Sequence, residues 1–185
     1  QKVYVKNPTN LYTLQAKAGK EYHIEILFKQ RNERATLDFD LGKQVEINLN
    51  LAVEKVKDAD VVLFAGGISP SLEGEEMPVE VSGFKGGDRT DIELPAVQRD
   101  LLRTLKKAGK KVVFINYSGS AIGLVPESNT CEAILQAWYP GQAGGTAIVD
   151  VLFGDYNPAG RLPVTFYKDA GQLPDFEDYS MKGRT

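Results

Sequence analysis

The spacing of hydrophobic residues along the chain changes near residue 45. Before that point, two runs at 22–28 and 36–41 alternate apolar and polar residues, which is the period of a half-buried strand. The polar stretch RNER at 31–34 separates the two runs, and Gly42 follows the second. The pattern therefore predicts a β-hairpin within residues 19–42.

After residue 45, continuous apolar runs alternate with stretches of helical period. Helices are expected after Asn48 as an N-cap, after Pro95, and over GGTAIVDVLFGD at 144–155. The runs DVVLFAGG, KVVFINY and EAILQAWYPG are typical of parallel strands buried on both faces, and NPAGRLPVTF is expected to end in a short strand. We predict an α/β fold, mainly a parallel-sheet sandwich over 46–185, preceded by a short all-β segment at 1–45.

Composition excludes several classes of protein. The net charge of -3 and the scattered Lys and Arg residues argue against nucleic-acid binding. No apolar run approaches the ~20 residues of a membrane span. The single cysteine, Cys131, and the single histidine, His23, argue against a disulfide and a structural zinc site, so we expect no metal and no cofactor. His23 is expected to face solvent.

The sequence SLEGEEMPVE directly follows the first apolar strand and begins a stretch rich in carboxylates. Seven acidic residues lie between 71 and 93: Glu73, Glu75, Glu76, Glu80, Asp88, Asp91 and Glu93. In a parallel sheet, ligands bind at the carboxyl ends of the strands. Repulsion between neighbouring carboxylates raises the pKa of some of them, as a general acid requires. A solvated acidic surface loop is the alternative interpretation.

Other functional motifs are incomplete. GGISPS does not match the dinucleotide fingerprint, and GQAGGT lacks the lysine of a phosphate-binding loop, which disfavours a nucleotide-binding domain. NYSGSA is not a nucleophile elbow, and His23 lies in the other segment, so a Ser-His hydrolase is disfavoured. Trp138 and Tyr139 are expected to serve packing rather than to stack on a sugar. The Gly and Pro residues of PGQAGG and NPAGRLP are expected to serve turns and close packing.

Two long runs carry a family resemblance. LEGEEMPVEVSGFKGGDRTDIELPAVQRDLL and AILQAWYPGQAGGTAIVDVLFGDYNPAGRLPVTF closely resemble the C-terminal α/β sandwich domain of family 3 glycoside hydrolases, which include β-glucosidases and β-xylosidases. The resemblance covers residues 48–180. Residues 1–45 are similar to the closing strands of a PA14-like β domain, on AGKEYHIEILFKQ and LDFDLG.

The resemblance implies a retaining β-glycosidase that uses two carboxylates roughly 5–5.5 Å apart. The nucleophile would be an Asp on an N-terminal TIM-like barrel, and the acid/base a Glu of the sandwich-domain loop. Because GEE precedes GGDR, Glu75 is the best match to the acid/base, Glu73 is second, and Glu76 third. Asp88 and Arg89 would either orient this loop or lie on the surface.

The substrates implied are oligosaccharides or aryl β-glycosides with terminal non-reducing β-D-glucosyl or β-D-xylosyl residues, and the location implied is periplasmic or secreted. No stretch resembles the barrel, so we expect this chain to be a fragment that is inactive alone. A non-catalytic carbohydrate-binding or interaction module is the alternative function.

Overall fold

The computed structural model describes residues 13–27, 42, 45–73, 79, 81–86, 88–175 and 177–182. The chain divides into two compact units, Gln1–Val45 and Glu46–Thr185. Within residues 13–27 of the first unit, the chain forms a turn at 18–19 and no strand. A strand needs a neighbour to pair with, and the second run of the predicted hairpin lies outside the described residues. The assignment of this unit to a PA14-like domain stays a prediction.

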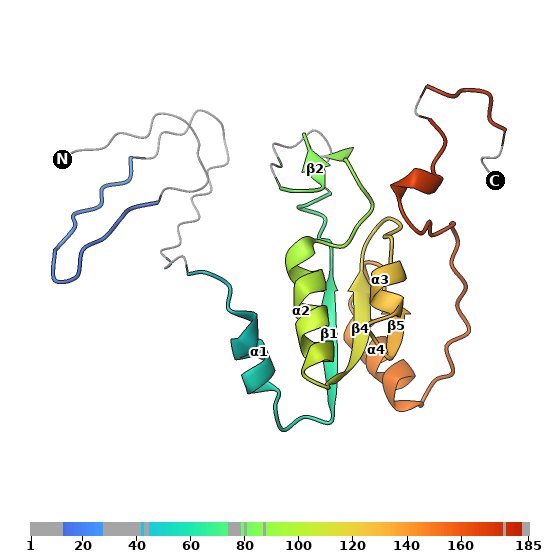
Figure 1. Ribbon diagram of the computed structural model, residues 1–185, viewed down its shortest axis with the longest axis horizontal. Helices are drawn as coiled ribbons and strands as arrows, with labels where there is room; N and C mark the ends of the chain where they lie inside the picture. Colours follow the sequence, from blue (N-terminus) through green and yellow to red (C-terminus); the bar gives the residue numbers. More distant parts are fainter. Residues whose placement is uncertain are drawn as a thin grey trace. The chain divides into compact units, whose positions relative to one another are not determined.

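The second unit contains a parallel sheet of three strands. They are β1 (Val61–Gly67), β4 (Lys111–Tyr117) and β5 (Ala133–Gln136), in the order β1-β4-β5 (Figure 1). Val61 lies opposite Lys111, and Val113 lies opposite Ala133. Each of the three apolar runs predicted as a strand forms a strand of this sheet. The predicted parallel α/β fold class is confirmed.

Two helices begin where the sequence indicates. α1 (Leu49–Lys55) is capped by Asn48, whose Oδ1 accepts a hydrogen bond of 3.0 Å from the Asn50 N–H. α2 (Ala96–Lys107) follows Pro95 and ends before Gly109, which has φ +75°. α2 packs on β4, and α1 packs on α2.

The C-terminal part holds α3 (Val125–Ser128), α4 (Gly144–Phe153) and a 3₁₀ turn, η1 (Ala170–Gln172). α4 ends at Gly154 in the left-handed region (φ 85°), as predicted. The short strand predicted within 157–166 is wrong, since no strand forms there. Pro158 and Pro163 each remove a backbone donor that a strand would need for pairing.

An antiparallel hairpin lies in the second half of the acidic stretch. It consists of β2 (Phe84–Lys85) and β3 (Asp88–Arg89), and its base is held by the Thr90 N–H, which donates to the Gly83 carbonyl at 2.9 Å. The buried Phe84 ring anchors the hairpin to the core. The sequence pattern did not predict it, because strands of two residues are too short to show a period.

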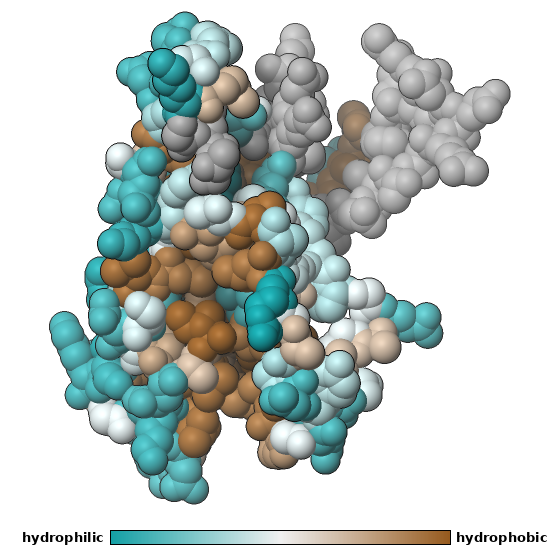
Figure 2. Space-filling model, turned by 90° about the vertical axis from the view of Figure 1, so that its right-hand side faces the viewer, coloured by the Kyte–Doolittle hydropathy of each residue, from teal (hydrophilic) through white to brown (hydrophobic). Residues whose placement is uncertain are grey.

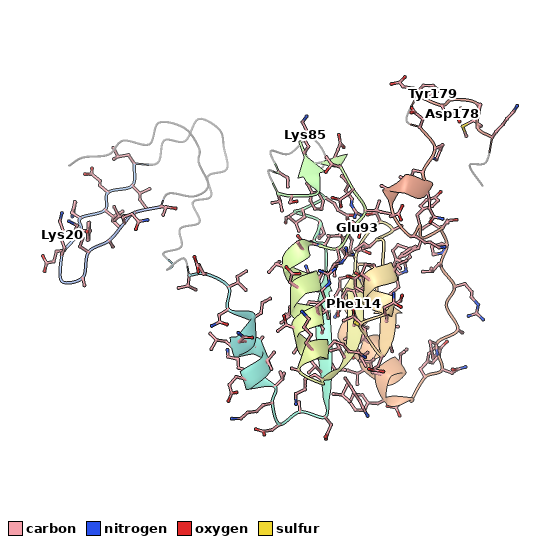
Figure 3. All side chains as sticks on the ribbon, viewed as in Figure 1. Lys20, Lys85, Glu93, Phe114, Asp178 and Tyr179 are labelled. Carbon is pink, nitrogen blue, oxygen red and sulfur yellow. The ribbon has the colours of Figure 1, made fainter. Side chains whose placement is uncertain are left out.

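The core lies around β4, whose Val112 and Phe114 are fully buried (Phe114 is labelled in Figure 3). Leu102 and Leu105 of α2 belong to the same cluster, together with side chains of the connecting segments such as Ile68 and Ile122. β1 differs from the prediction, because its two faces are not equally covered: Val61 and Leu63 are about half exposed. Apolar groups are also exposed on the face seen in Figure 2.

A candidate active site at the carboxyl end of the sheet

The acidic stretch leaves β1 through a rigid exit at Gly67. This residue has φ +125°, and a Cβ here would lie 1.9 Å from the Tyr117 carbonyl oxygen, so only glycine fits. The Gln98 side chain holds the same residue from α2. Its Oε1 accepts from the Gly67 N–H and its Nε2 donates to the Gly67 carbonyl, both at 2.7 Å. The direction in which the chain leaves the sheet is therefore fixed.

A compact turn then carries the chain to Glu73. The Ile68 N–H donates to the Tyr117 carbonyl at 2.8 Å, which ties the turn to the end of β4. The N–H groups of Leu72 and Glu73 both donate to the Ser69 carbonyl, at 2.9 and 3.1 Å. Glu73, the second choice for the acid/base, is thus held just beyond the carboxyl ends of β1 and β4.

Both carboxylate oxygens of Glu73 accept hydrogen bonds from hydroxyl groups. The Ser120 hydroxyl donates to Oε1, and the Tyr139 hydroxyl donates to Oε2 at 2.5 Å. The Tyr139 oxygen also lies 3.0 Å from the Ile68 carbonyl oxygen. Burial, together with the hydrogen bond to Glu73, raises the pKa of Tyr139 to about 12, so the phenol keeps its proton at neutral pH.

Arg89 reaches the same point from the other side of the acidic stretch. Its guanidinium donates to the Ser120 hydroxyl oxygen at 3.2 Å and to the carbonyls of Ala121 (2.9 Å) and Asp91 (3.0 Å). Burial lowers the pKa of Arg89, and the negative charge of Glu73 is the largest opposing influence. Of the two roles expected for Arg89, these backbone contacts favour orientation of the loop over a plain surface position. Glu73 and Arg89, from the two sides of the acidic stretch, both contact Ser120.

A glycine and a left-handed residue lie beside this contact. A Cβ on Gly119 would lie 2.6 Å from the Tyr139 ring and 2.9 Å from Glu73 Oε2. Trp138 has φ 56°, a left-handed conformation that is costly for a bulky side chain. Its indole packs edge-on against Phe166, with ring centroids 5.8 Å apart. The predicted packing role is therefore observed for Trp138, whereas Tyr139 serves as a hydrogen-bond donor.

Asp88 is an exposed residue of β3, and the remaining carboxylates of the stretch fall into two groups. Glu75, the first choice for the acid/base, lies outside the described residues with Glu76 and Glu80. Among those described, Asp91 Oδ1 caps the Glu93 N–H at 2.9 Å, and Glu93 pairs with Arg99 at 2.6 Å. These two carboxylates therefore stabilise the segment that leads to α2 (Glu93 is labelled in Figure 3).

Sequence reasoning missed a buried ion pair behind this segment. Arg99 binds Glu127 through two contacts, Nε to Oε1 at 2.6 Å and Nη2 to Oε2 at 3.1 Å, and also donates to the Gly123 carbonyl. The Glu127 side chain is only 1% exposed. Burial opposes the charge on Arg99, but its hydrogen bonds to Glu127 and Glu93 raise its pKa above the ordinary value. Glu127 lies in a four-residue helix, which is too short for a sequence period to mark it as buried.

An open depression of about 320 Å³ lies beside the Glu73 contact. Tyr139 and Tyr117 line it together with Gln98 and the exit of β1 at 66–70. Among the residues that the structure describes, no group of three or more His, Cys, Asp or Glu is placed to bind a metal ion. Within the same described residues, no helix is long and apolar enough to cross a membrane.

The chain has clear relatives among characterised proteins. Residues 2–185 match the family described as glycosyl hydrolase family 3 C-terminal domain. A xylan 1,4-β-xylosidase of Xylanibacter ruminicola is 57% identical over 93% of this chain, which corresponds to 20% of that protein. A periplasmic β-glucosidase of Salmonella typhimurium is 42% identical over 72% of this chain and 16% of that protein. The chain thus spans about a fifth of the length of these relatives.

Solved structures show the same fold. A β-glucosidase of Bifidobacterium adolescentis is 32% identical, with a TM-score of 0.60 over 71% of this chain and 18% of its own. A β-glucosidase of Listeria innocua, solved in complex with gluconolactone, is 27% identical, with a TM-score of 0.59 over 71% of this chain and 17% of its own. The α/β arrangement described above is therefore that of these enzymes over the matched part.

Proposed function

We propose, because this chain belongs to glycosyl hydrolase family 3 through its C-terminal domain, that it supplies the proton-transferring carboxylate of a retaining β-glycosidase. The enzyme hydrolyses terminal non-reducing β-D-glucosyl or β-D-xylosyl residues. Relatives named as xylosidase and as glucosidase support this range. The xylosidase is 57% identical, which makes an aryl β-xyloside the first substrate to test.

One observation carries the proposal. The acidic stretch begins and ends at the carboxyl edge of a parallel sheet, and both ends are tied to Ser120, through Glu73 on one side and Arg89 on the other. A loop that is rigid at its base can present a carboxylate to a substrate with a reproducible geometry. A merely solvated surface loop would have no need of such anchoring.

Within this stretch, the acid/base is Glu75, with Glu73 as the alternative. In a retaining mechanism, this carboxylic acid first protonates the leaving glycosidic oxygen and then, as a carboxylate, takes a proton from the attacking water. A second carboxylate attacks the anomeric carbon and is displaced in that later step. We place this nucleophile, an Asp, on a TIM-like barrel elsewhere in the parent protein.

A periplasmic or secreted location fits this function, since one relative is named a periplasmic β-glucosidase. Substrates of this kind reach a cell as oligosaccharides from outside it. The partners of the domain are therefore the barrel of its own protein and a carbohydrate.

The comparison of this chain with its parent protein tests the proposal. Purified 185-residue material is expected to show no turnover of nitrophenyl β-xyloside or β-glucoside, because only one of the two required carboxylates is present. The parent is expected to hydrolyse one or both. Robust hydrolysis by the chain alone would refute the division of the site between two domains, and an inactive parent would argue against a glycosidase altogether.

A further inference from the structure

We propose that a part of the parent protein upstream of this chain docks on β1 and completes the parallel sheet. The free edge of β1 takes a further parallel strand of apolar sequence, and a helix from the same upstream part lies over Val61 and Leu63. This inference concerns how the domain is assembled, so it does not depend on the proposed chemistry.

β1 lies at the edge of the sheet, although its sequence is typical of a central strand. Among the described residues β1 pairs with β4 alone, without interruption from Val61 to Gly67. Natural edge strands avoid further pairing through charged residues, prolines, bulges or short length. The β1 sequence VVLFAGG contains no charge and no proline, and it is seven residues long. Its free edge is therefore suited to pairing with another strand.

The two faces of β1 differ in how they are covered. Side chains alternate between the faces of a strand, and Val62 and Phe64 pack against the core cluster. On the other face Val61 and Leu63 are 46% and 51% exposed. All-parallel sheets of α/β proteins have helices on both faces. The face that holds Val61 and Leu63 therefore lacks the cover that such a sheet requires.

The helices of the covered face indicate where the missing strand lies. Val53 of α1 packs against the same cluster as Leu102 of α2, so both helices lie on one face of the sheet (Figure 1). α2 connects β1 to β4, and such crossovers are right-handed in nearly all proteins. A strand that leads into β1 through α1, on the same face and with the same hand, must lie on the side of β1 opposite β4. That side is the free edge.

Several observations favour a strand from upstream of residue 1. The described residues before α1 form no strand. The run at 36–41 lies outside the described residues, and in this sheet its Asp38 and Asp40 would place two carboxylates on one covered face. The xylosidase relative is about five times as long as its match to this chain, which leaves room for the missing strand and helix. The segment 1–45 would then interrupt the connection from that strand to α1.

Alkylation at position 63 tests whether the exposed face is covered in the parent. Leu63→Cys and the control Arg103→Cys are made in the 185-residue chain and in the parent, and iodoacetamide labelling is followed on the peptide that holds each position. Arg103 of α2 is a matched control, because its side chain is 54% exposed. Both variants are expected to react at similar rates in the chain. In the parent, Leu63→Cys is expected to react roughly a hundredfold more slowly, because labelling then needs a local opening, while Arg103→Cys keeps its rate.

Amide hydrogen exchange tests the free edge in the unsubstituted protein, so it also decides the question if Leu63→Cys does not fold. The N–H groups of an edge strand point alternately toward its neighbour and toward the open side. In the chain, a peptide over Val61–Gly67 is expected to exchange about half of its amides rapidly. In the parent, nearly all amides of this peptide are expected to be protected.

Photo-crosslinking identifies what covers the face. Benzoylphenylalanine is placed at position 63 of the parent, and the cross-linked peptide is determined by mass spectrometry. The peptide is expected to come from the same molecule, from the sequence between the barrel and residue 1 of this chain.

The inference is overturned if Leu63→Cys slows no more than Arg103→Cys in the parent, or if the β1 peptide exchanges equally in both proteins. A cross-link to the barrel, to residues 36–41 or to a second parent molecule would also overturn it. Labelling of Leu63→Cys that slows in the 185-residue chain as its concentration rises would show instead that two copies pair through this face. None of these measurements requires turnover, so an inactive parent would refute the proposed function and leave this inference standing.

Discussion

Replacing Arg99 by methionine tests how strongly the buried ion pair holds the base of the site. Glu127 is 1% exposed, and Arg99 supplies both of its hydrogen bonds from a guanidinium whose side chain is 14% exposed. Removing one partner of a buried pair leaves an uncompensated charge and costs about 3–5 kcal/mol. Glu93 also loses its partner. Its side chain is 33% exposed, so this loss adds little to the destabilisation, because water replaces the contact.

Urea unfolding of the 185-residue chain, followed by circular dichroism, measures this loss. With an m-value of about 2 kcal/mol/M for a domain of this size, the midpoint is expected to fall by roughly 2 M. Arg103→Met is the matched control. It lies on the same helix and is 54% exposed, and within the described part of the chain its ion-pair partner is the exposed Asp100, so its effect is expected to stay within about 0.5 kcal/mol.

A double variant separates the charge effect from packing. Arg99→Met with Glu127→Leu replaces both charges by apolar groups, and such exchanges are often neutral. The double variant is therefore expected to be more stable than Arg99→Met alone. A loss below about 1 kcal/mol for Arg99→Met, or a double variant whose loss equals the sum of the two single losses, would refute the reasoning.

Three further predictions concern the exit of β1, the core and the single cysteine of the chain. Gly67→Ala is expected to destabilise the chain by at least ~2 kcal/mol in the same urea assay, because a Cβ would meet the Tyr117 carbonyl at 1.9 Å; an unchanged midpoint would contradict the tight exit of β1. Leu102→Ala, at a side chain 1% exposed, is expected to cost about 2–5 kcal/mol, whereas a surface-like loss of under 0.5 kcal/mol would place the core elsewhere. Burial raises the pKa of Cys131 from 9.0 to about 11, so alkylation by iodoacetamide at pH 8 is expected to be roughly a hundredfold slower than that of free cysteine. The stability that the neutral thiol contributes is present below pH 9 and is lost as the pH rises through about 11. If Cys131 and free cysteine are alkylated at equal rates at pH 8, the thiol does not lie in such a buried environment.

The sequence predicts most of the sheet and its helices because their signals are local. Asn48 as a cap, Pro95 before a helix and Gly154 after one act within a single turn of the chain, and each is observed in its role. The strand expected within 157–166 does not form. Its apolar residues alternate as in a strand, but its prolines lack the backbone N–H that strand pairing needs. Apolar period alone therefore overstates strand formation near Pro.

The contacts of the candidate site are not local, and this is why the sequence could not supply them. Glu73 meets Ser120 and Tyr139, which lie 47 and 66 residues further along the chain. The sequence could indicate that a loop at the carboxyl end of a strand carries the chemistry. It could not indicate that Glu73 is held by hydroxyl groups, since that depends on the register of three parallel strands and on the left-handed turn at Trp138.

The most direct test of the central claim, that this domain supplies the proton donor of a retaining β-glycosidase, is azide trapping in the full-length parent. Glu75→Ala is incubated with a dinitrophenyl β-xyloside or β-glucoside and azide, and the anomeric configuration of the product is read by NMR. A β-glycosyl azide is expected, because azide attacks the covalent glycosyl-enzyme in the space that the missing carboxylate leaves. The claim is contradicted if no variant at Glu73, Glu75 or Glu76 forms a glycosyl azide while each keeps the parent's rate on the phenyl glycoside.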